Sequence, residues 1–227
     1  PQHHAIVKPW RAVIEYVRAG TQIITETNVP DAENISYFGN GSDEANQVYQ
    51  FALPPLVLHA FTAGTAETLS RWAATITPIS DTATYFNFLA SHDGIGMRPS
   101  EGILTEDERQ SLVQKVLHNG GRVSMKLNPD GSQTVYELNI NYLDALANGE
   151  EIDQPAVVAA KGLAAHSILC SVMGIPAIYY HSLFGSSLDM VGMKASGIKR
   201  RINRETLNAE QLIHELATDE RRHTMFN

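Results

Sequence analysis

The chain has 227 residues, a net charge of −8 at pH 7 and a hydrophobic content of 43%. This length allows one sizeable domain with its own core, or two small ones. The acidic balance and the lack of a basic stripe argue against a nucleic-acid partner. No apolar stretch approaches the ~20 residues that cross a bilayer, so we expect no membrane partner. A single cysteine, Cys170, excludes an internal disulfide, and a cytoplasmic location is the simplest expectation.

Helical and strand periods of apolar residues alternate along the chain. The helical pattern predicts helices over residues 8–20, 65–76, 105–121, 154–174 and 208–223. Short apolar runs with β-branched residues predict buried strands over residues 21–28, 46–61, 82–93 and 175–182. Pro54 and Pro55 must end or bend the second of these strands. Residues 122–143 interrupt the alternation and predict a hairpin about the turn "NPDG".

Two of the predicted helices carry clear local signals. In the first, Pro9 lies near the start, and one face carries Trp10, Val13, Ile14 and Val17. The helix over 105–121 opens with a capping box from Thr105 to Glu108.

The order of the elements predicts an α/β fold. Short, doubly buried strands separated by helices imply parallel strands joined by right-handed crossovers. About four strands are expected, which is half of an eight-stranded barrel and also enough for a small open sheet. The pattern alone leaves both possibilities open.

Polar residues gather where the predicted strands end. They are Glu26, Asn28, His92, Asp93, Tyr180, His181 and Ser182. The carboxyl ends of strands carry the chemistry of α/β folds, and a carboxylate on each of two strands suggests paired acid–base work such as glycoside cleavage. The alternative interpretation is ordinary helix capping by Asp, Asn and Ser at the strand ends.

Two other kinds of site are excluded by the spacing of the residues. Ser91, His92 and Asp93 are consecutive, so their side chains alternate between the faces of a strand and cannot form a catalytic triad. The segment "HELATDERRH" lacks the H-E-x-x-H spacing of a zinc site. The sequence therefore predicts no metal site and no cofactor.

Four longer blocks follow one another in a specific order. They are "IITETNVPDAENISYFGNGSDEANQVYQFALPPLVLHAF", "FNFLASHDGIGMRPSEGIL", "VYELNINYLDAL" and "GIPAIYYHSLFGSSLDMVGMKASGIKRRINRE". In order and spacing, over about residues 1–227, they resemble the sucrose-phosphorylase-like branch of the alpha-amylase superfamily, glycoside hydrolase family 13. The resemblance implies the second half of a (β/α)8 TIM barrel, about strands 5–8 with their helices. Residues 1–227 would be part of one catalytic domain, with a hairpin insertion near 122–143.

The resemblance also implies catalytic roles. Glu26 matches the general acid/base of the family, Asp93 its transition-state stabiliser, and His92 the histidine that contacts the glucosyl unit. A general acid must be protonated when it acts, so we expect Glu26 in an apolar, partly closed site walled by Ile23 and Ile24. Asp93 should stay ionised, helped by His92 and an arginine.

Substrate-binding roles are implied in the same way. Arg204, in "INR", resembles the arginine that holds the glucosyl ring, and Arg200 is a second candidate for that role. Tyr136 and Glu137 resemble the mobile loop that serves the acceptor and phosphate side. Asp31 stands where many relatives carry histidine. The first four strands of the family's barrel lie outside this sequence, including the strand with the nucleophilic aspartate.

The expected activity is that of a retaining glycoside phosphorylase, which transfers glucosyl from a sucrose-like α-glucoside to phosphate. The acceptor stays open among fructose, phosphorylated fructose, glycerate and glycerol. The alternatives are an α-glucoside hydrolase or transglucosylase that uses the same residues, or a non-catalytic half-barrel for assembly or sugar binding. Without the nucleophile, the isolated fragment is expected to be inactive. Its open strand edges predict a homodimer or a marginally stable monomer.

Overall fold

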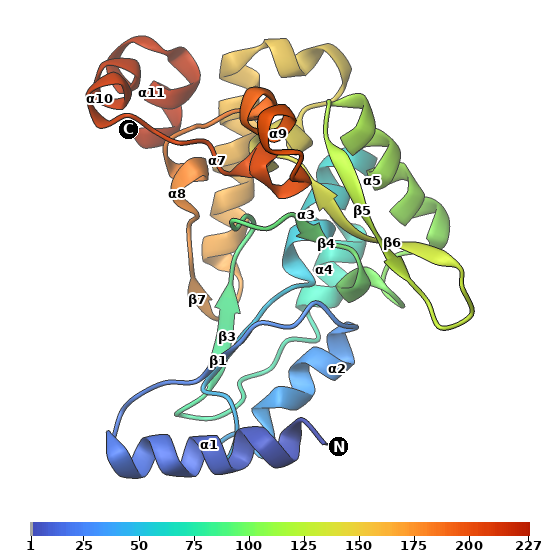
Figure 1. Ribbon diagram of the computed structural model, residues 1–227, viewed down its shortest axis with the longest axis vertical. Coiled ribbons are helices and arrows are strands. Elements are labelled where there is room, and N and C mark those ends of the chain that lie inside the picture. Colours follow the sequence, from blue (N-terminus) through green and yellow to red (C-terminus); the bar gives the residue numbers. More distant parts are fainter. Residues whose placement is uncertain (1) are drawn as a thin grey trace.

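The computed structural model in Figure 1 describes residues 2–227. Its central sheet has four parallel strands in the order β1-β2-β3-β7, which is also their order along the chain. These strands are β1 (Ile24–Thr25), β2 (Gln47–Tyr49), β3 (Thr84–Asn87) and β7 (Ile175–Pro176). All three neighbouring pairs are parallel, so the prediction of parallel strands separated by helices is confirmed.

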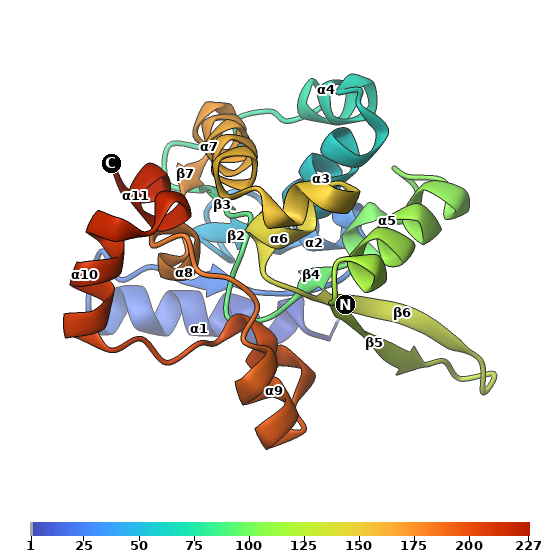
Figure 2. The same cartoon turned by 90° about the horizontal axis from the view of Figure 1, so that it is seen from above.

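A second, antiparallel sheet stands beside the first. It has the order β4-β6-β5 and consists of β4 (Ile95–Gly96), β5 (Arg122–Leu127) and β6 (Gln133–Asn139). Strands β5 and β6 form a hairpin within residues 122–143, and this hairpin projects from the molecule (Figures 1 and 2). Its inner part pairs with β4, which directly follows the turn after β3. The second sheet is therefore joined to the carboxyl end of a central strand.

The helices surround these sheets. They are α1 (His4–Val17), α2 (Asp31–Ile35), α3 (Leu53–Ala63), α4 (Glu67–Ala73), α5 (Glu106–His118), α6 (Tyr142–Leu146), α7 (Pro155–Ser171), α8 (Tyr180–Leu183), α9 (Met190–Ser196), α10 (Ala209–Thr218) and α11 (Glu220–Phe226). A 3-10 turn, η4 (Lys199–Asn203), follows α9. The helix predicted over 105–121 begins with the expected capping box, in which Thr105 and Glu108 bond each other's main chain.

The main core lies where α3, α5, α6 and α7 meet beside β6. Leu56, Leu112, Leu138 and Leu169 are fully buried in this cluster. Burying such a side chain contributes about 1.5–3 kcal/mol relative to leaving it in water. These helices therefore hold the second sheet firmly against the rest of the chain.

Two of the predicted strands are wrong in part. Within residues 46–61, the strand ends at Tyr49 and α3 begins at Leu53, because proline is well accommodated in the first turn of a helix. Within residues 175–182, only two residues form a strand, and they lie at the sheet edge with Ile175 44% exposed. The residues that follow turn into α8 instead of a buried strand.

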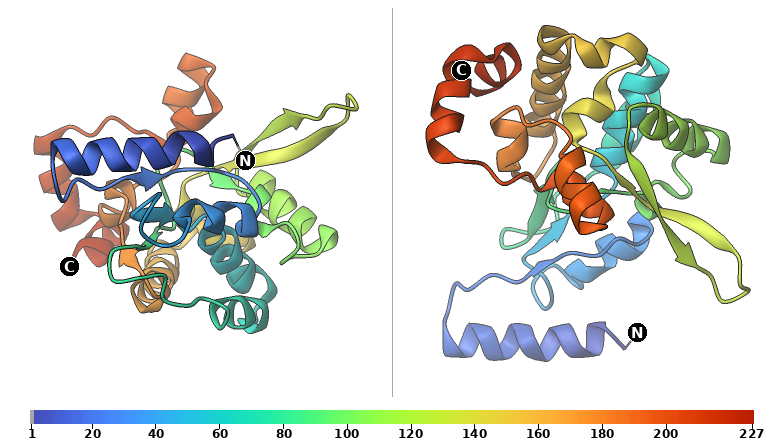
Figure 3. Two further views of the ribbon diagram at one scale, coloured as in Figure 1. Left: turned by 90° about the horizontal axis from the view of Figure 1, so that it is seen from below. Right: turned by 45° about the horizontal axis from the view of Figure 1, so that its top comes forward.

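Two of the predicted helices also differ in detail. The helix predicted over 208–223 is divided at Asp219, whose extended backbone ends α10 and whose side chain accepts from Arg222 N–H to begin α11. In the first helix, Pro9 lies inside α1, not at its first turn. The apolar face of α1 is largely exposed: Trp10 is 59% exposed, and of this helix only Val7 is buried. Helix α1 lies at one end of the molecule, away from α7 and α11 (Figures 1 and 3).

None of the helices over residues 2–227 combines the length and the apolar character needed to span a membrane.

Candidate active site

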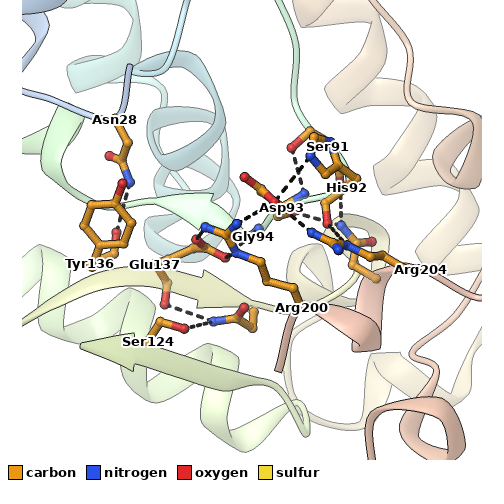
Figure 4. A network of polar contacts seen from close by, with 12 residues as sticks. Asn28, Ser91, His92, Asp93, Gly94, Ser124, Tyr136, Glu137, Arg200 and Arg204 are labelled. Carbon is orange, nitrogen blue, oxygen red and sulfur yellow. Dashed lines mark hydrogen bonds and ion pairs between the residues drawn. The ribbon is translucent and has the colours of Figure 1, made fainter. Parts of the chain in front are cut away.

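Side chains from four parts of the fold meet around a cleft of about 220 Å³. Glu26 follows β1 directly, Asp93 lies in the turn between β3 and β4, Glu137 is on β6, and Arg200 is on η4. The cleft is lined by Glu26, Asn28, Phe51, His92, Asp93, Gly94, Gly96, Tyr136, Glu137 and Arg200. Figure 4 shows Arg200 between Asp93 and Glu137. Six of the seven candidate residues named from the sequence therefore line one cavity. The seventh, Arg204, contacts Asp93.

The carboxylate of Asp93 is held through one of its two oxygens. Its Oδ1 lies 2.9 Å from Nη1 of Arg200, 2.9 Å from Nη2 of Arg204 and 3.5 Å from Nε2 of His92. No hydrogen bond from residues 2–227 reaches the other oxygen, Oδ2. Two guanidinium groups thus converge on the same oxygen, and Asp93 Oδ1 is held by both arginines. One oxygen therefore stays available for a ligand.

The main chain of the Asp93 turn is held from the same side. Arg204 Nε donates to the carbonyl of His92 at 2.6 Å, and Asn203 Nδ2 donates to the carbonyls of Ser91 at 2.5 Å and Asp93 at 3.1 Å. Within the turn, the Asp93 N–H donates to Ser91 Oγ. Asn203 is almost fully buried, and its own carbonyl accepts from the hydroxyl of Tyr179 at 3.0 Å. These contacts fix the main chain of the turn and with it the direction of the Asp93 side chain.

Two glycines allow the main chain to pass close to the neighbouring strands. A Cβ atom on Gly94 would collide with the carbonyl of Leu138 and would lie 2.7 Å from Oε1 of Glu137. A Cβ atom on Gly96 would lie 2.7 Å from Oδ1 of Asn28. At position 94 the Leu138 main chain leaves room only for glycine, whereas a side chain at position 96 would require Asn28 to move. Asn28 in turn donates to the carbonyl of Tyr136 at 3.3 Å, which joins the first strand end to β6.

Glu26 lies in a more open position than the sequence suggested. Its side chain is exposed, and Ile24 is 45% exposed, so the described residues do not close an apolar site around it. Nearby, the pKa of Tyr49 is raised by burial and, to a smaller extent, by the negative charge of Glu26. The aromatic rings of Tyr49, Phe51, Phe86 and Phe88 contact one another instead, and Phe51 lines the cleft.

Several strand-end residues lie away from the cleft. Tyr180, His181 and Ser182 belong to α8, and His181 Nδ1 is buried 2.8 Å from Ser186 Oγ. Asp31 begins α2 and accepts from Nε1 of Trp72, and burial raises the pKa of its carboxyl. Sequence reasoning missed Asn203 and Phe51. Asn203 could have been suspected from its place beside Arg204 in "INR", whereas no local signal distinguishes Phe51.

The arrangement suits acid–base chemistry by carboxyl groups. Three carboxylates, those of Glu26, Asp93 and Glu137, line one cleft, and Arg200 pairs with two of them. No three His, Cys, Asp or Glu side chains of residues 2–227 come together in a way that could hold a metal ion.

No protein-family model matches the chain. It is 47% identical over 213 residues to the glucosylglycerate phosphorylase of Escherichia coli and 50% identical over 214 residues to that of Allomeiothermus silvanus. Each alignment covers 94% of this chain and 38% of the relative. Sucrose phosphorylase of Agrobacterium vitis is 31% identical over 72% of this chain and 32% of the relative. The chain therefore spans well under half of the length of the curated relatives it matches.

A solved structure agrees in fold. Sucrose 6F-phosphate phosphorylase from Thermoanaerobacter thermosaccharolyticum matches with a TM-score of 0.79 and 20% identity, over 99% of this chain and 43% of that one. The chain belongs to the sucrose-phosphorylase-like branch of the alpha-amylase superfamily, glycoside hydrolase family 13, and corresponds to one part of these enzymes. Within this class of glycoside phosphorylases, its sequence is similar along nearly its whole length to the glucosylglycerate phosphorylases.

Proposed function

We propose that this chain is the second half of the (β/α)8 catalytic barrel of a retaining glycoside phosphorylase, about strands 5–8. The four strands lie side by side in chain order, and both edges of their sheet are open. A closed barrel has no such edges, so four further strands would complete it. The cleft of about 220 Å³ is smaller than the ~300–1,000 Å³ of ligand pockets, which fits a site that lacks part of its wall.

The reaction would transfer a glucosyl unit from an α-glucoside to phosphate through a covalent glucosyl-enzyme. The observation that carries this proposal is the pair Glu26 and Asp93, which face one cleft from the carboxyl ends of two parallel strands. Glu26 would protonate the leaving oxygen and later take the proton from phosphate. The additional wall of a complete barrel would supply the burial that its protonation needs.

Asp93 would stabilise the positive charge that develops on the glucosyl ring. Its free Oδ2 can face the sugar while Oδ1 is held by Arg200 and Arg204. His92, which is exposed beside it, and Arg204 would border the glucosyl unit. The nucleophile would come from the part of the barrel outside this chain, at the ~5–5.5 Å carboxyl separation of retaining enzymes.

The natural donor is proposed to be glucosylglycerate, with glycerate as the group released. Support comes from the 47–50% identity to enzymes that carry this name, compared with 31% for the sucrose phosphorylase. The runner-up activity is hydrolysis or transglucosylation by the same residues, because water or a sugar hydroxyl can take the place of phosphate in the second step.

The test uses the longer phosphorylase that contains this chain. Incubated with glucosylglycerate and phosphate, it should release glucose 1-phosphate, whereas free glucose as the main product would favour the hydrolase. Glu26→Gln should lower turnover by about 10²–10⁴-fold on a donor with a poor leaving group. Most of this loss should disappear on α-glucosyl fluoride, which needs no protonation. Glu67→Gln, an exposed carboxylate on α4, serves as the control.

The chain alone is proposed to be inactive, because it lacks the nucleophile. Purified residues 1–227 that released glucose 1-phosphate in the presence of phosphate would contradict this. We also propose that the isolated chain forms a homodimer, because its open strand edges and the exposed apolar face of α1 can pair with a second copy. Sedimentation that shows a stable compact monomer at micromolar concentration would argue against it.

A further inference from the structure

Glu137 lines the cleft, yet only 3% of its side chain is exposed. Its Oε1 accepts from the Gly94 N–H at 2.8 Å and from Arg200 Nε at 3.1 Å, and its Oε2 accepts from Arg200 Nη2 at 2.6 Å. The two contacts with Arg200 have the bidentate geometry that a planar guanidinium offers to a carboxylate. Three donors thus hold a nearly buried carboxylate, and little of it can be reached by a substrate.

Both hydrogen-bond partners of Glu137, Gly94 and Arg200, also adjoin Asp93. Gly94 directly follows Asp93, and the carbonyl of Leu138 beside it excludes any side chain at that position. Arg200 uses its remaining terminal nitrogen, Nη1, to reach Asp93 Oδ1 at 2.9 Å (Figure 4). Glu137 therefore holds two groups that adjoin Asp93, the candidate stabiliser. They are the Gly94 main chain and the Arg200 guanidinium.

Arg200 makes two of its contacts with Glu137 and one with Asp93. Nε and Nη2 of Arg200 face Glu137 on β6, and only Nη1 reaches Asp93. Without a charge on Glu137, the guanidinium would gain by turning to bind both oxygens of Asp93, because bidentate pairs are stronger than single contacts. Such a turn would cover Oδ2, the oxygen that no hydrogen bond from residues 2–227 reaches in the present arrangement.

We propose that Glu137 is a positioning residue, which holds Arg200 and the Gly94 main chain so that Asp93 presents Oδ2 to the substrate. The inference rests on the proposed function, in which Asp93 stabilises the charge on the glucosyl ring. It differs from the sequence-based expectation that Glu137 itself serves the acceptor or phosphate. In this arrangement Glu137 acts through Arg200, and its loss affects the chemical step more than substrate binding.

Kinetics of the longer phosphorylase test this role. Glu137→Gln preserves the size of the side chain and an oxygen for the Gly94 N–H, but removes the charge. We expect kcat to fall by about 10–100-fold while KM for the glucosyl donor changes by less than about three-fold. Glu137→Asp keeps the charge and should recover part of kcat. Glu101→Gln removes a carboxylate outside the cleft and should leave kcat unchanged.

A double variant distinguishes positioning through Arg200 from a general structural effect. If Glu137 acts through Arg200, the variant Glu137→Gln/Arg200→Leu should have the same kcat as Arg200→Leu alone. Additive losses would overturn the proposal. So would a raised KM at unchanged kcat, which indicates direct substrate binding, or a kcat of Glu137→Gln within about two-fold of the unaltered enzyme.

A second measurement requires no catalysis. In the chain of 227 residues, NMR follows exchange of the Arg200 Nε–H with solvent, which the bond to Glu137 should slow. We expect exchange at least about ten-fold faster in Glu137→Gln and no change in Glu101→Gln. Absence of phosphorolysis by the longer protein would contradict the proposed function alone. Equal exchange rates in Glu137→Gln and the unaltered chain would overturn the orientation on which this inference depends.

Discussion

The ion pair between Arg221 and Asp144 offers the clearest test of how the C-terminal helices are held. Arg221 on α11 bonds Asp144 on α6 through Nη1, and the two side chains are only 8% and 4% exposed. Arg221 Nη2 also donates to the carbonyl of Ser186 at 2.5 Å. Arg221→Met would remove the positive charge and leave the carboxylate of Asp144 buried without a counter-charge.

Removing one partner of a buried ion pair lowers the free energy of unfolding by about 3–5 kcal/mol, because the remaining charge is buried away from water without a counter-charge. The free energy of unfolding of a domain is about 5–15 kcal/mol, so this loss is a large fraction of the total. Urea denaturation of the chain, followed by circular dichroism, should report a fall of this size for Arg221→Met. Arg71→Met breaks a pair with Glu67 whose side chains are both well exposed and should change stability by less than about 1 kcal/mol.

The double variant Arg221→Met/Asp144→Leu isolates the pair. Replacing both charges by apolar groups should recover most of the lost free energy of unfolding. A loss of about 1–2 kcal/mol should remain, because the carbonyl of Ser186 no longer has its donor. The reasoning would be refuted by a loss below about 1 kcal/mol for Arg221→Met. It would equally be refuted by a double variant as unstable as the sum of the two single ones.

Three further predictions concern the same chain. Burial and the nearby Lys161 lower the pKa of Lys115 to about 8 from 10.5, so between these pH values the unfolded chain holds a proton that the folded chain has released. Stability should therefore rise from pH 8 to 10.5, by about 1–2 kcal/mol after allowance for partial exposure, and Lys115→Met should abolish this rise in urea titrations. Tyr142 is fully buried, and its hydroxyl donates to the carbonyl of Pro54 at 2.8 Å. Tyr142→Phe should lower the free energy of unfolding by about 1–2 kcal/mol in the same assay. An unchanged urea midpoint would count against a stabilising role of that bond. Gly94→Ala should lower the free energy of unfolding by about 1–3 kcal/mol through overcrowding. It should also abolish turnover in the proposed longer phosphorylase, and normal turnover would show that the contact with β6 is dispensable.

Much of the local structure could be predicted from neighbouring residues. The capping box at Thr105 starts α5, and "NPDG" joins β5 to β6, because these signals act over a few residues. The strand prediction failed over residues 50–61, where the apolar run fits a buried strand and a buried helix equally well. It failed again after Ile175, where α8 takes the place of a strand.

The sequence by itself determined the parallel α/β pattern. With the family resemblance, it also predicted the candidate site residues, which are Glu26, His92, Asp93, Tyr136, Glu137, Arg200 and Arg204. Only the tertiary structure decided how these side chains meet. Asn203 bonds a carbonyl 112 positions away, and Glu137 bonds an amide 43 positions away. Such contacts depend on how separate elements pack, and no periodicity within one segment records them. For that reason only the tertiary structure shows that Oδ2 of Asp93, on which the proposed chemistry depends, accepts no hydrogen bond from the described residues.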